Sequence, residues 1–488
     1  MTSGLAEASR ALDSATRAWE QAVFGSALPA GWSGLASEAA RASWGRLVER
    51  GGDVVDRARR LAAVVADVAT ADVATAHVAT AHVATAHVTA AATTDRPLDP
   101  EHDARLVAAL TAAARPGPGA VGAPREGPEP AAVAHWWTGL DEPERARLTA
   151  ERPELVGGLD GIPALDRDLA NRLRLAAARR EATAQEAALD AARDRATGFG
   201  DLQDVEARLA EVHGRLSRLA AIERAVGPGH ALLDLDPAAG RAAVASGDID
   251  RAGHVGVFVP GFTARAEDLP ERIAELDALA ARAGPDSAVV AWYDYAAPQW
   301  SGVTDPARSV LGTRPASDAA GRLASFLTGL DAARPAARAH VTAIGHSYGT
   351  LTVAQAVPAA RGVDDVVLLG CPGVTPAPVR PRAVWVGEAH GDAIADTGWF
   401  GPDPSSDPRV RVLAMGPEPA RTAPSGSALP PTAGVRGHGG YLRPGSTSAE
   451  GVAAVVAGRP GDVVEDRTVG AGDRLRDLFG TGALRPGA

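Results

Sequence analysis

The stretch that decides the fold is His340-Val-Thr-Ala-Ile-Gly-His-Ser-Tyr-Gly-Thr350. It begins with a β-branched and apolar run, continues as Gly-x-Ser-x-Gly, and leads into an Ala/Val-rich stretch, 351–360, that can be helical. A strand, a sharp turn and a helix in this order expose a serine hydroxyl at the tip of a strained turn. Gly345 and Gly349 flank Ser347 because side chains there would collide between strand and helix. The pattern alone is weak in a glycine-rich chain, but in this context it predicts a serine nucleophile.

The composition excludes several classes of function. The 488 residues carry a net charge of −11 and no arginine cluster forms a basic stripe, so no nucleic-acid partner is expected. The length is too great for one core, and two or three domains are expected. The single cysteine, Cys371, excludes an internal disulfide framework and a cysteine-based zinc site, and we expect it in the core. No metal or organic cofactor is expected.

The N-terminus lacks the basic start, apolar core and cleavage site of a secretory signal. The long weakly polar stretch 61–92 is an unlikely membrane span, since it carries an acidic or imidazole group at every fifth position: Asp67, Asp72, His77, His82 and His87. On a helix these histidines fan around the axis, so they are not expected to hold a metal ion. We therefore expect a soluble protein, cytoplasmic by default.

Changes in composition divide the chain into four parts. Residues 1–114 are expected to form a helical hairpin that ends in an Ala/Val/Thr/His repeat, and 115–130 is a Pro/Gly-rich linker. Residues 131–229 are expected to be helical and to act as a possible cap, while 230–488 form the catalytic domain. The helical part contains two charged helices that can pair as a hairpin, 166–196 and 202–225.

The C-terminal part predicts an α/β-hydrolase fold, a mainly parallel doubly wound sheet. Two runs around a Pro/Gly turn, 231–235 and 241–245, suggest an antiparallel pair. Beyond them strand-like runs alternate with helices near 267–284 and 316–333, which is typical of a parallel sheet. The further strand candidates are 254–259, 288–293, 341–344, 365–369, 383–387 and 409–415.

The general base is sought downstream of Ser347, because in this fold the triad follows the order serine, acid, histidine. Only two histidines follow Ser347 in the chain, His390 and His438. His438 lies beyond the last expected strand and just before a helix, where a general base belongs. His390 directly follows a strand, which is the usual place for the acid. We therefore favour His438 over His390.

The acid is then Asp392, which follows the strand candidate 383–387. It would fix the tautomer of His438 and stabilise its imidazolium form. Glu388 and Asp396 in the same loop are competitors for this role.

An oxyanion hole requires two backbone N–H donors. Tyr348, the residue after the nucleophile, supplies the first. The second is expected from Phe262 in the loop after strand 254–259, because Pro260 has no N–H and Gly261 allows the backbone to come close.

Together these motifs resemble an α/β-hydrolase family of unknown substrate that is abundant in actinobacteria. The similarity covers about residues 130–460 and is carried by Trp136-Trp137, Leu159-Asp-Gly-Ile-Pro163, Arg167-Asp168, Asn171-Arg172, Val259-Pro-Gly261, Trp292-Tyr-Asp-Tyr-Ala-Ala-Pro298, Gly345-His-Ser-Tyr-Gly349 and Trp399-Phe-Gly-Pro-Asp-Pro404. The resemblance implies hydrolase chemistry with Ser347, Asp392 and His438 as the triad, but no particular substrate. The chain departs from the family by carrying Phe262-Thr263 after Pro-Gly, where smaller residues are expected.

The N-terminal region is similar to the WXG-type helical hairpins of type VII secretion systems. Trp32-Ser-Gly34 lies between two expected helices, as in those hairpins. This resemblance implies a helical WXG-type protein partner and secretion by a type VII-like route. The tyrosine-plus-acid export signal is missing, since all four tyrosines lie in the hydrolase part, so export would need a partner that carries it.

The expected function is that of a serine hydrolase, esterase- or lipase-like, that cleaves an ester or related acyl bond of a small-molecule substrate. The alternative is an interaction or effector protein associated with type VII secretion, in which the hydrolase domain is a scaffold. The connection 370–382 is too short for a cap, so we expect the helices before residue 230 to set access to the pocket.

Overall fold

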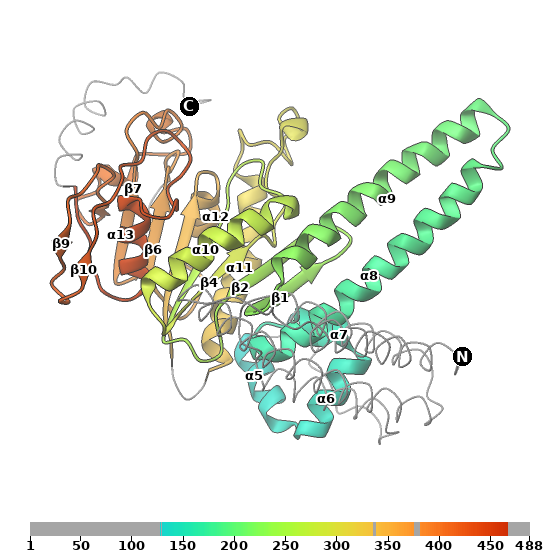
Figure 1. Ribbon diagram of the computed structural model, residues 1–488, viewed down its shortest axis with the longest axis horizontal. Helices are drawn as coiled ribbons and strands as arrows, with labels where there is room; N and C mark the ends of the chain where they lie inside the picture. Colours follow the sequence, from blue (N-terminus) through green and yellow to red (C-terminus); the bar gives the residue numbers. More distant parts are fainter. Residues whose placement is uncertain (1–126, 128, 335–337, 375–380, 467–488) are drawn as a thin grey trace, which may run out of the picture.

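The computed structural model describes residues 127, 129–334, 338–374 and 381–466 (Figure 1). The expected WXG-like hairpin, the Ala/Val/Thr/His repeat and nearly all of the Pro/Gly-rich linker lie outside the described residues.

A sheet of eight strands forms the centre of the fold, in the order β1-β2-β4-β3-β5-β6-β7-β8. All neighbours from β4 to β8 are parallel, whereas β2 pairs antiparallel with both β1 and β4. The mainly parallel sheet and the antiparallel pair before it are therefore confirmed. The strands are β1 (His230–Asp236), β2 (Arg241–Ser246), β3 (His254–Val259), β4 (Ser287–Trp292), β5 (His340–His346), β6 (Val363–Leu369), β7 (Ala383–Gly387) and β8 (Arg411–Val412).

The last strand is shorter than the run 409–415 from which it was expected. After Val412 the chain keeps one more bond to β7 and then pairs elsewhere. The Ala414 N–H donates to the Val464 carbonyl, and the Met415 carbonyl accepts from the Val435 N–H. The apolar end of the run is therefore buried against the C-terminal segments and not within the sheet.

Helices cover both faces of the sheet, as the apolar strands require. One face packs against α10 (Leu269–Ala283) and α13 (Thr447–Val456), and the other against α11 (Arg314–Ala332) and α12 (Gly349–Ala356). Short 3₁₀ turns lie in the loops between them: η1 (Ala266–Asp268), η2 (Trp300–Gly302), η3 (Ala395–Thr397) and η4 (Pro404–Ser406). A separate two-stranded sheet is formed by β9 (Arg421–Thr422) and β10 (Ala428–Leu429).

The helical segment before the sheet contains α5 (Pro130–Gly139), α6 (Glu142–Glu151), α7 (Pro153–Gly158), α8 (Ala164–Arg193) and α9 (Phe199–Ala225). The last two form a hairpin that extends beyond the sheet as a long arm (Figure 1). Ion pairs such as Arg215–Glu181, at 3.0 Å, join its two helices. Trp137 is buried in a small core with α6 and α7, and its Nε1–H donates to Asp166 at 3.0 Å, as an anchoring side chain would.

The first turns of α8 fasten the helical segment to β1 through buried polar side chains. Asp168 accepts the Leu232 N–H at 2.6 Å, and the Asn171 side chain donates to the Leu232 carbonyl at 3.0 Å. Arg172 donates to the His230 carbonyl at 2.8 Å and pairs with Asp168. Asp168 and Asn171 are buried, which is tolerable only because their polar atoms are hydrogen-bonded. Part of the charge of this helix is thus buried inside the protein.

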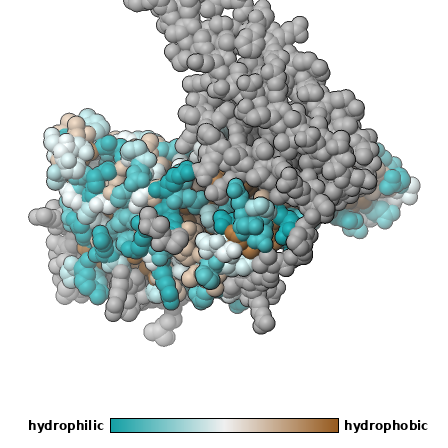
Figure 2. Space-filling model, turned by 90° about the horizontal axis from the view of Figure 1, so that it is seen from below, coloured by the Kyte–Doolittle hydropathy of each residue, from teal (hydrophilic) through white to brown (hydrophobic). Residues whose placement is uncertain are grey.

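No helix in the described part of the chain is both long and apolar enough to cross a membrane. Where the face in Figure 2 is coloured it is mainly hydrophilic, with only small separate hydrophobic spots.

Candidate active site

Ser347 lies at the tip of the turn between β5 and α12 and has a φ of 54°. An L-residue other than glycine rarely adopts this left-handed conformation, and such strain is concentrated at functional sites. The Ser347 N–H donates to the Leu369 carbonyl at 2.9 Å, which fixes the turn against β6.

The flanking glycines are required by close packing around this turn. A Cβ at Gly345 would lie 2.7 Å from Thr350 Cα, and one at Gly349 would overlap the carbonyls of Val259 and Pro260. Gly261, in the loop after β3, is equally constrained: its Cβ would lie 2.6 Å from the Ser347 Cβ. Both elbow glycines are therefore needed for the steric reason expected from the sequence.

Ser347, His438 and Asp392 form one continuous chain of hydrogen bonds. His438 Nε2 lies 2.7 Å from the Ser347 hydroxyl oxygen. On the other side of the ring, Nδ1 lies 2.8 Å and 3.0 Å from the two carboxylate oxygens of Asp392. The three residues come from the loops after β5, β7 and β8, separated by 91 and 46 positions in the chain.

Asp392 is buried and is held as a carboxylate. Burial alone would raise the pKa of Asp392, but hydrogen bonds from His438, Tyr441 and the Ala395 N–H outweigh it and lower the pKa to about 2. The Tyr441 hydroxyl donates to Asp392 at 2.5 Å while it accepts the Ala389 N–H at 3.0 Å. Tyr441 therefore fixes both the carboxylate and the backbone that precedes it. Tyr441 was not among the site residues expected from the sequence.

The His346 ring packs against the rings of His438 and Tyr441. It lies 5.1 Å from the His438 ring and 5.6 Å from the Tyr441 ring, centroid to centroid. Burial lowers the pKa of His346 to about 4, so its ring is neutral at pH 7. Its Nε2 lies 2.9 Å from the His438 carbonyl, which only accepts, so this nitrogen carries the proton and donates. The backbone of the residue expected to act as base is thus tied to the residue before Ser347.

The alternative base and acids do not join this chain of hydrogen bonds. The His390 side chain is exposed. Its backbone carbonyl accepts the Gly437 N–H at 3.1 Å and so helps to position the loop that carries His438. Asp396 is exposed and Glu388 half-buried. Asp392 is the carboxylate that lies within bonding distance of His438 through both of its oxygens.

The expected oxyanion donors flank Ser347 on the loop after β3 and at the start of α12. Within the described ranges, neither the Phe262 N–H nor the Tyr348 N–H donates to another protein group, whereas the neighbouring Thr263 N–H is bonded to the Pro298 carbonyl at 2.9 Å. The Phe262 ring packs edge-to-face on Trp300, at 4.7 Å between centroids. Its bulk is therefore directed at a neighbouring ring.

Cys371 is buried, as expected, and burial raises the pKa of its thiol to about 12. Across the residues that the structure covers, no group of three or more His, Cys, Asp or Glu side chains could hold a metal ion.

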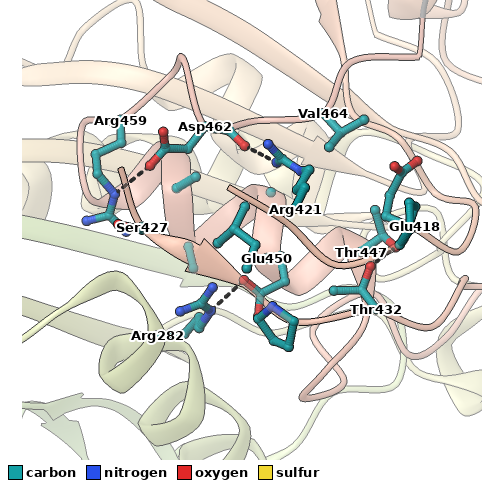
Figure 3. Close-up of a pocket in the computed structure, with 16 residues that line it drawn as sticks. Arg282, Glu418, Arg421, Ser427, Thr432, Thr447, Glu450, Arg459, Asp462 and Val464 are labelled. Carbon is teal, nitrogen blue, oxygen red and sulfur yellow. Dashed lines mark hydrogen bonds and ion pairs between the residues drawn. The ribbon is translucent and has the colours of Figure 1, made fainter. Parts of the chain in front are cut away.

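A small cavity of about 50 Å³ lies between β9, β10 and α13 (Figure 3). Four of its charged groups form two ion pairs: Arg282 is paired with Glu450 at 2.5 Å, and Arg459 with Asp462 at 3.2 Å. None of the three residues of the hydrogen-bonded chain lines it. The cavity is therefore separate from the candidate active site.

Comparison with known proteins places this geometry in a family. The family described as Alpha/beta hydrolase matches residues 236–402. Uncharacterized protein Rv2079 of Mycobacterium tuberculosis is 34% identical over 295 residues, which covers 54% of this chain but only 44% of that relative. Uncharacterized protein Mb0988c of Mycobacterium bovis is 32% identical over 227 residues, covering 43% of this chain and 84% of the relative. The chain thus spans less than half the length of the first relative and most of the second, and it belongs to an α/β-hydrolase family that includes these mycobacterial proteins.

Proposed function

We propose that this chain is a serine hydrolase that cleaves an ester or related acyl bond through an acyl-enzyme. Ser347 is the nucleophile, His438 the general base and Asp392 the residue that orients it. The observation that carries the proposal is the hydrogen-bonded chain from Ser347 through His438 to Asp392, with the serine held at a φ of 54°. A hydroxyl held at a strained turn and an oriented imidazole are the two requirements of this chemistry, although the structure leaves Ser347 only 6% exposed.

The first step transfers the Ser347 proton to His438 Nε2 as the serine oxygen bonds to the acyl carbon. The Asp392 carboxylate accepts the Nδ1–H, which leaves Nε2 free to take that proton and stabilises the resulting imidazolium. The N–H groups of Phe262 and Tyr348 would stabilise the negative charge on the former carbonyl oxygen. His438 then returns the proton to the leaving group, and water releases the acyl group by the same steps in reverse order.

The loops around the site favour an apolar acyl group. Trp300 is 74% exposed, Leu311 53% and Ile394 43%, which is unusual for side chains of this size. Trp300 packs on Phe262, and the Ile394 N–H donates to Asp392, so two of the three belong to loops that build the site. Apolar side chains at the entrance would contact a short acyl chain or a lipid-like ester.

A fluorophosphonate probe tests the proposal directly, because it reacts covalently only with an activated serine. The wild type and a Ser301→Ala control, in which an exposed serine is removed, should be labelled equally, while Ser347→Ala should not be labelled. The same pattern is expected for hydrolysis of 4-nitrophenyl butyrate. Equal labelling of Ser347→Ala would show that the nucleophile is another residue. No labelling of the wild type would favour the scaffold alternative.

A further inference from the structure

A second cavity, of about 570 Å³, lies on the other side of the loop that follows β3. Its walls are the base of α9, the turn between β1 and β2, the loops after β3 and β4, and the first turns of α11. This volume is in the range of sites that hold small molecules. It is thus large enough for a substrate group.

The charged residues that line the cavity are mainly cations, although the chain as a whole carries a charge of −11. Two carboxylates line it, Glu267 and Asp318, against five arginines: Arg218, Arg241, Arg265, Arg308 and Arg322. Such a local excess of positive charge attracts anions.

Two of the arginines are paired with carboxylates that do not themselves line the cavity. Arg241 pairs with Asp236 at 2.5 Å and lies 3.5 Å from Asp294, which also pairs with Arg322 at 3.2 Å. These side chains are therefore held in place by the protein and form a fixed part of the wall.

Arg218 and Arg308 have no such partner. In the described part of the chain no ion pair involves either residue, and Arg218 Nε is buried without a hydrogen-bond acceptor. Arg218 lies across Gly240, where a Cβ would be 2.5 Å from its Cδ and where φ is +67°. With no carboxylate of the described residues paired to them, the guanidinium groups of Arg218 and Arg308 are available to pair with an anion in the cavity.

The cavity shares a wall with the candidate active site. Pro260 and Ala264 line it, and Gly261 between them is packed against Ser347. Tyr295, another lining residue, donates its hydroxyl to the Pro260 carbonyl at 2.5 Å and so fixes this wall. One loop, 260–264, therefore lies between Ser347 and the cavity.

We propose that this cavity is a subsite for an anionic group, a carboxylate or a phosphate, carried by the substrate. Arginine is the residue best suited to both, because its planar donors match their paired oxygens. Arg218 and Arg308 bind the anion, and the paired Arg241 and Arg322 form the fixed wall beside them. The substrate class is an acyl ester with a remote negative charge. This substrate role rests on the proposed hydrolase function, whereas anion binding itself does not.

Anion binding is measured by calorimetry on the Ser347→Ala protein, which cannot turn over an ester. Hexanedioate and hexyl phosphate are the probes, and 1,6-hexanediol is the neutral probe of the same length. At least one anion should bind and the diol should not. Adding Arg218→Gln or Arg308→Gln should weaken binding roughly tenfold or more, as loss of a charge-assisted bond predicts. Arg224→Gln, an exposed arginine on the same helix α9 that does not line the cavity, is the control and should change nothing.

Whichever anion binds identifies the favoured chemistry. The proposal fails if neither anion binds, or if the Arg218→Gln, Arg308→Gln double variant binds as tightly as its parent.

The substrate role is tested with the mono-4-nitrophenyl ester of adipic acid and its methyl-capped, neutral counterpart. Arg218→Gln should raise the KM of the anionic ester relative to the neutral one by roughly tenfold, while Arg224→Gln leaves the ratio unchanged. An unchanged ratio in Arg218→Gln would reject the substrate role. If neither ester is hydrolysed by the wild type, the hydrolase proposal fails, and calorimetry still decides whether the cavity binds anions.

Discussion

Tyr441→Phe removes one oxygen atom from the candidate site and leaves its packing intact. Tyr441 is 2% exposed, and its hydroxyl donates to Asp392 at 2.5 Å and accepts the Ala389 N–H at 3.0 Å. A bond to a charged acceptor contributes roughly 1.5–3 kcal/mol, and the stranded Ala389 N–H adds to the loss. We therefore expect the free energy of unfolding to fall by roughly 2–4 kcal/mol at pH 7.

The loss should depend on pH with a definite sign. The pKa of Asp392 is lowered to about 2 in the folded protein, so the carboxylate contributes stability above the ordinary pKa of about 4, and the contribution is lost as the pH falls towards 2. Without the tyrosine hydroxyl the pKa of Asp392 should rise. The difference between wild type and variant should then be full at pH 7 and smaller at pH 3.

Urea unfolding followed by tryptophan fluorescence at both pH values measures this difference, and ester hydrolysis measures its effect on activity. If about half of the lost free energy is added to the activation free energy of ester hydrolysis, kcat falls roughly tenfold. Asp392→Asn supplies the control, because in that background the acceptor is neutral and the effect of Tyr441→Phe should shrink. Identical unfolding and rates for Tyr441→Phe and wild type would refute the reasoning.

Three further changes test other parts of the site. Asp392→Asn should lower kcat by about 10⁴-fold with little change in KM, since the amide favours the wrong tautomer of His438; steady-state kinetics with 4-nitrophenyl butyrate will show whether it does. Gly261→Ala should abolish hydrolysis and fluorophosphonate labelling, because its Cβ would lie 2.6 Å from the Ser347 Cβ; full labelling would mean that the turn can adapt. His346→Gln should flatten the loss of stability on acidification, because the half-buried neutral ring has a pKa of about 4 and the unfolded chain takes up its proton as the pH falls below about 6.5. Thermal unfolding between pH 7 and pH 4 measures this effect, expected to be roughly 3 kcal/mol, and an unchanged slope would contradict it.

The sequence was informative about the sheet and the turn because both are determined locally. Apolar runs separated by helical segments predict parallel strands. The glycines on either side of Ser347 stand where the structure leaves no room for a Cβ beside the neighbouring backbone. The proximity of His438 to Ser347 was inferred from chain order alone, since only two histidines follow the serine. Their catalytic roles remain the proposal.

What the sequence could not predict depends on contacts between distant segments. Asp168 and Asn171 lie in a charged helical pattern, and their burial follows only from bonds to Leu232, 64 and 61 positions later. Likewise, Tyr441 could be placed beside Asp392 only once the loops after β7 and β8 were brought together. The arginines of the larger cavity come from positions 218 to 322 and form no cluster in the chain.

The bonds from α8 to Leu232 also have a consequence for how the molecule behaves in solution. Among the strands that the structure describes, β1 has a neighbour on only one side, so its other side would present free backbone donors and acceptors to any extended peptide. Asp168 and Asn171 occupy the N–H and carbonyl of Leu232 at the centre of that margin. The helix thereby blocks strand addition, and a molecule deprived of it would be prone to stack with its own copies into fibres.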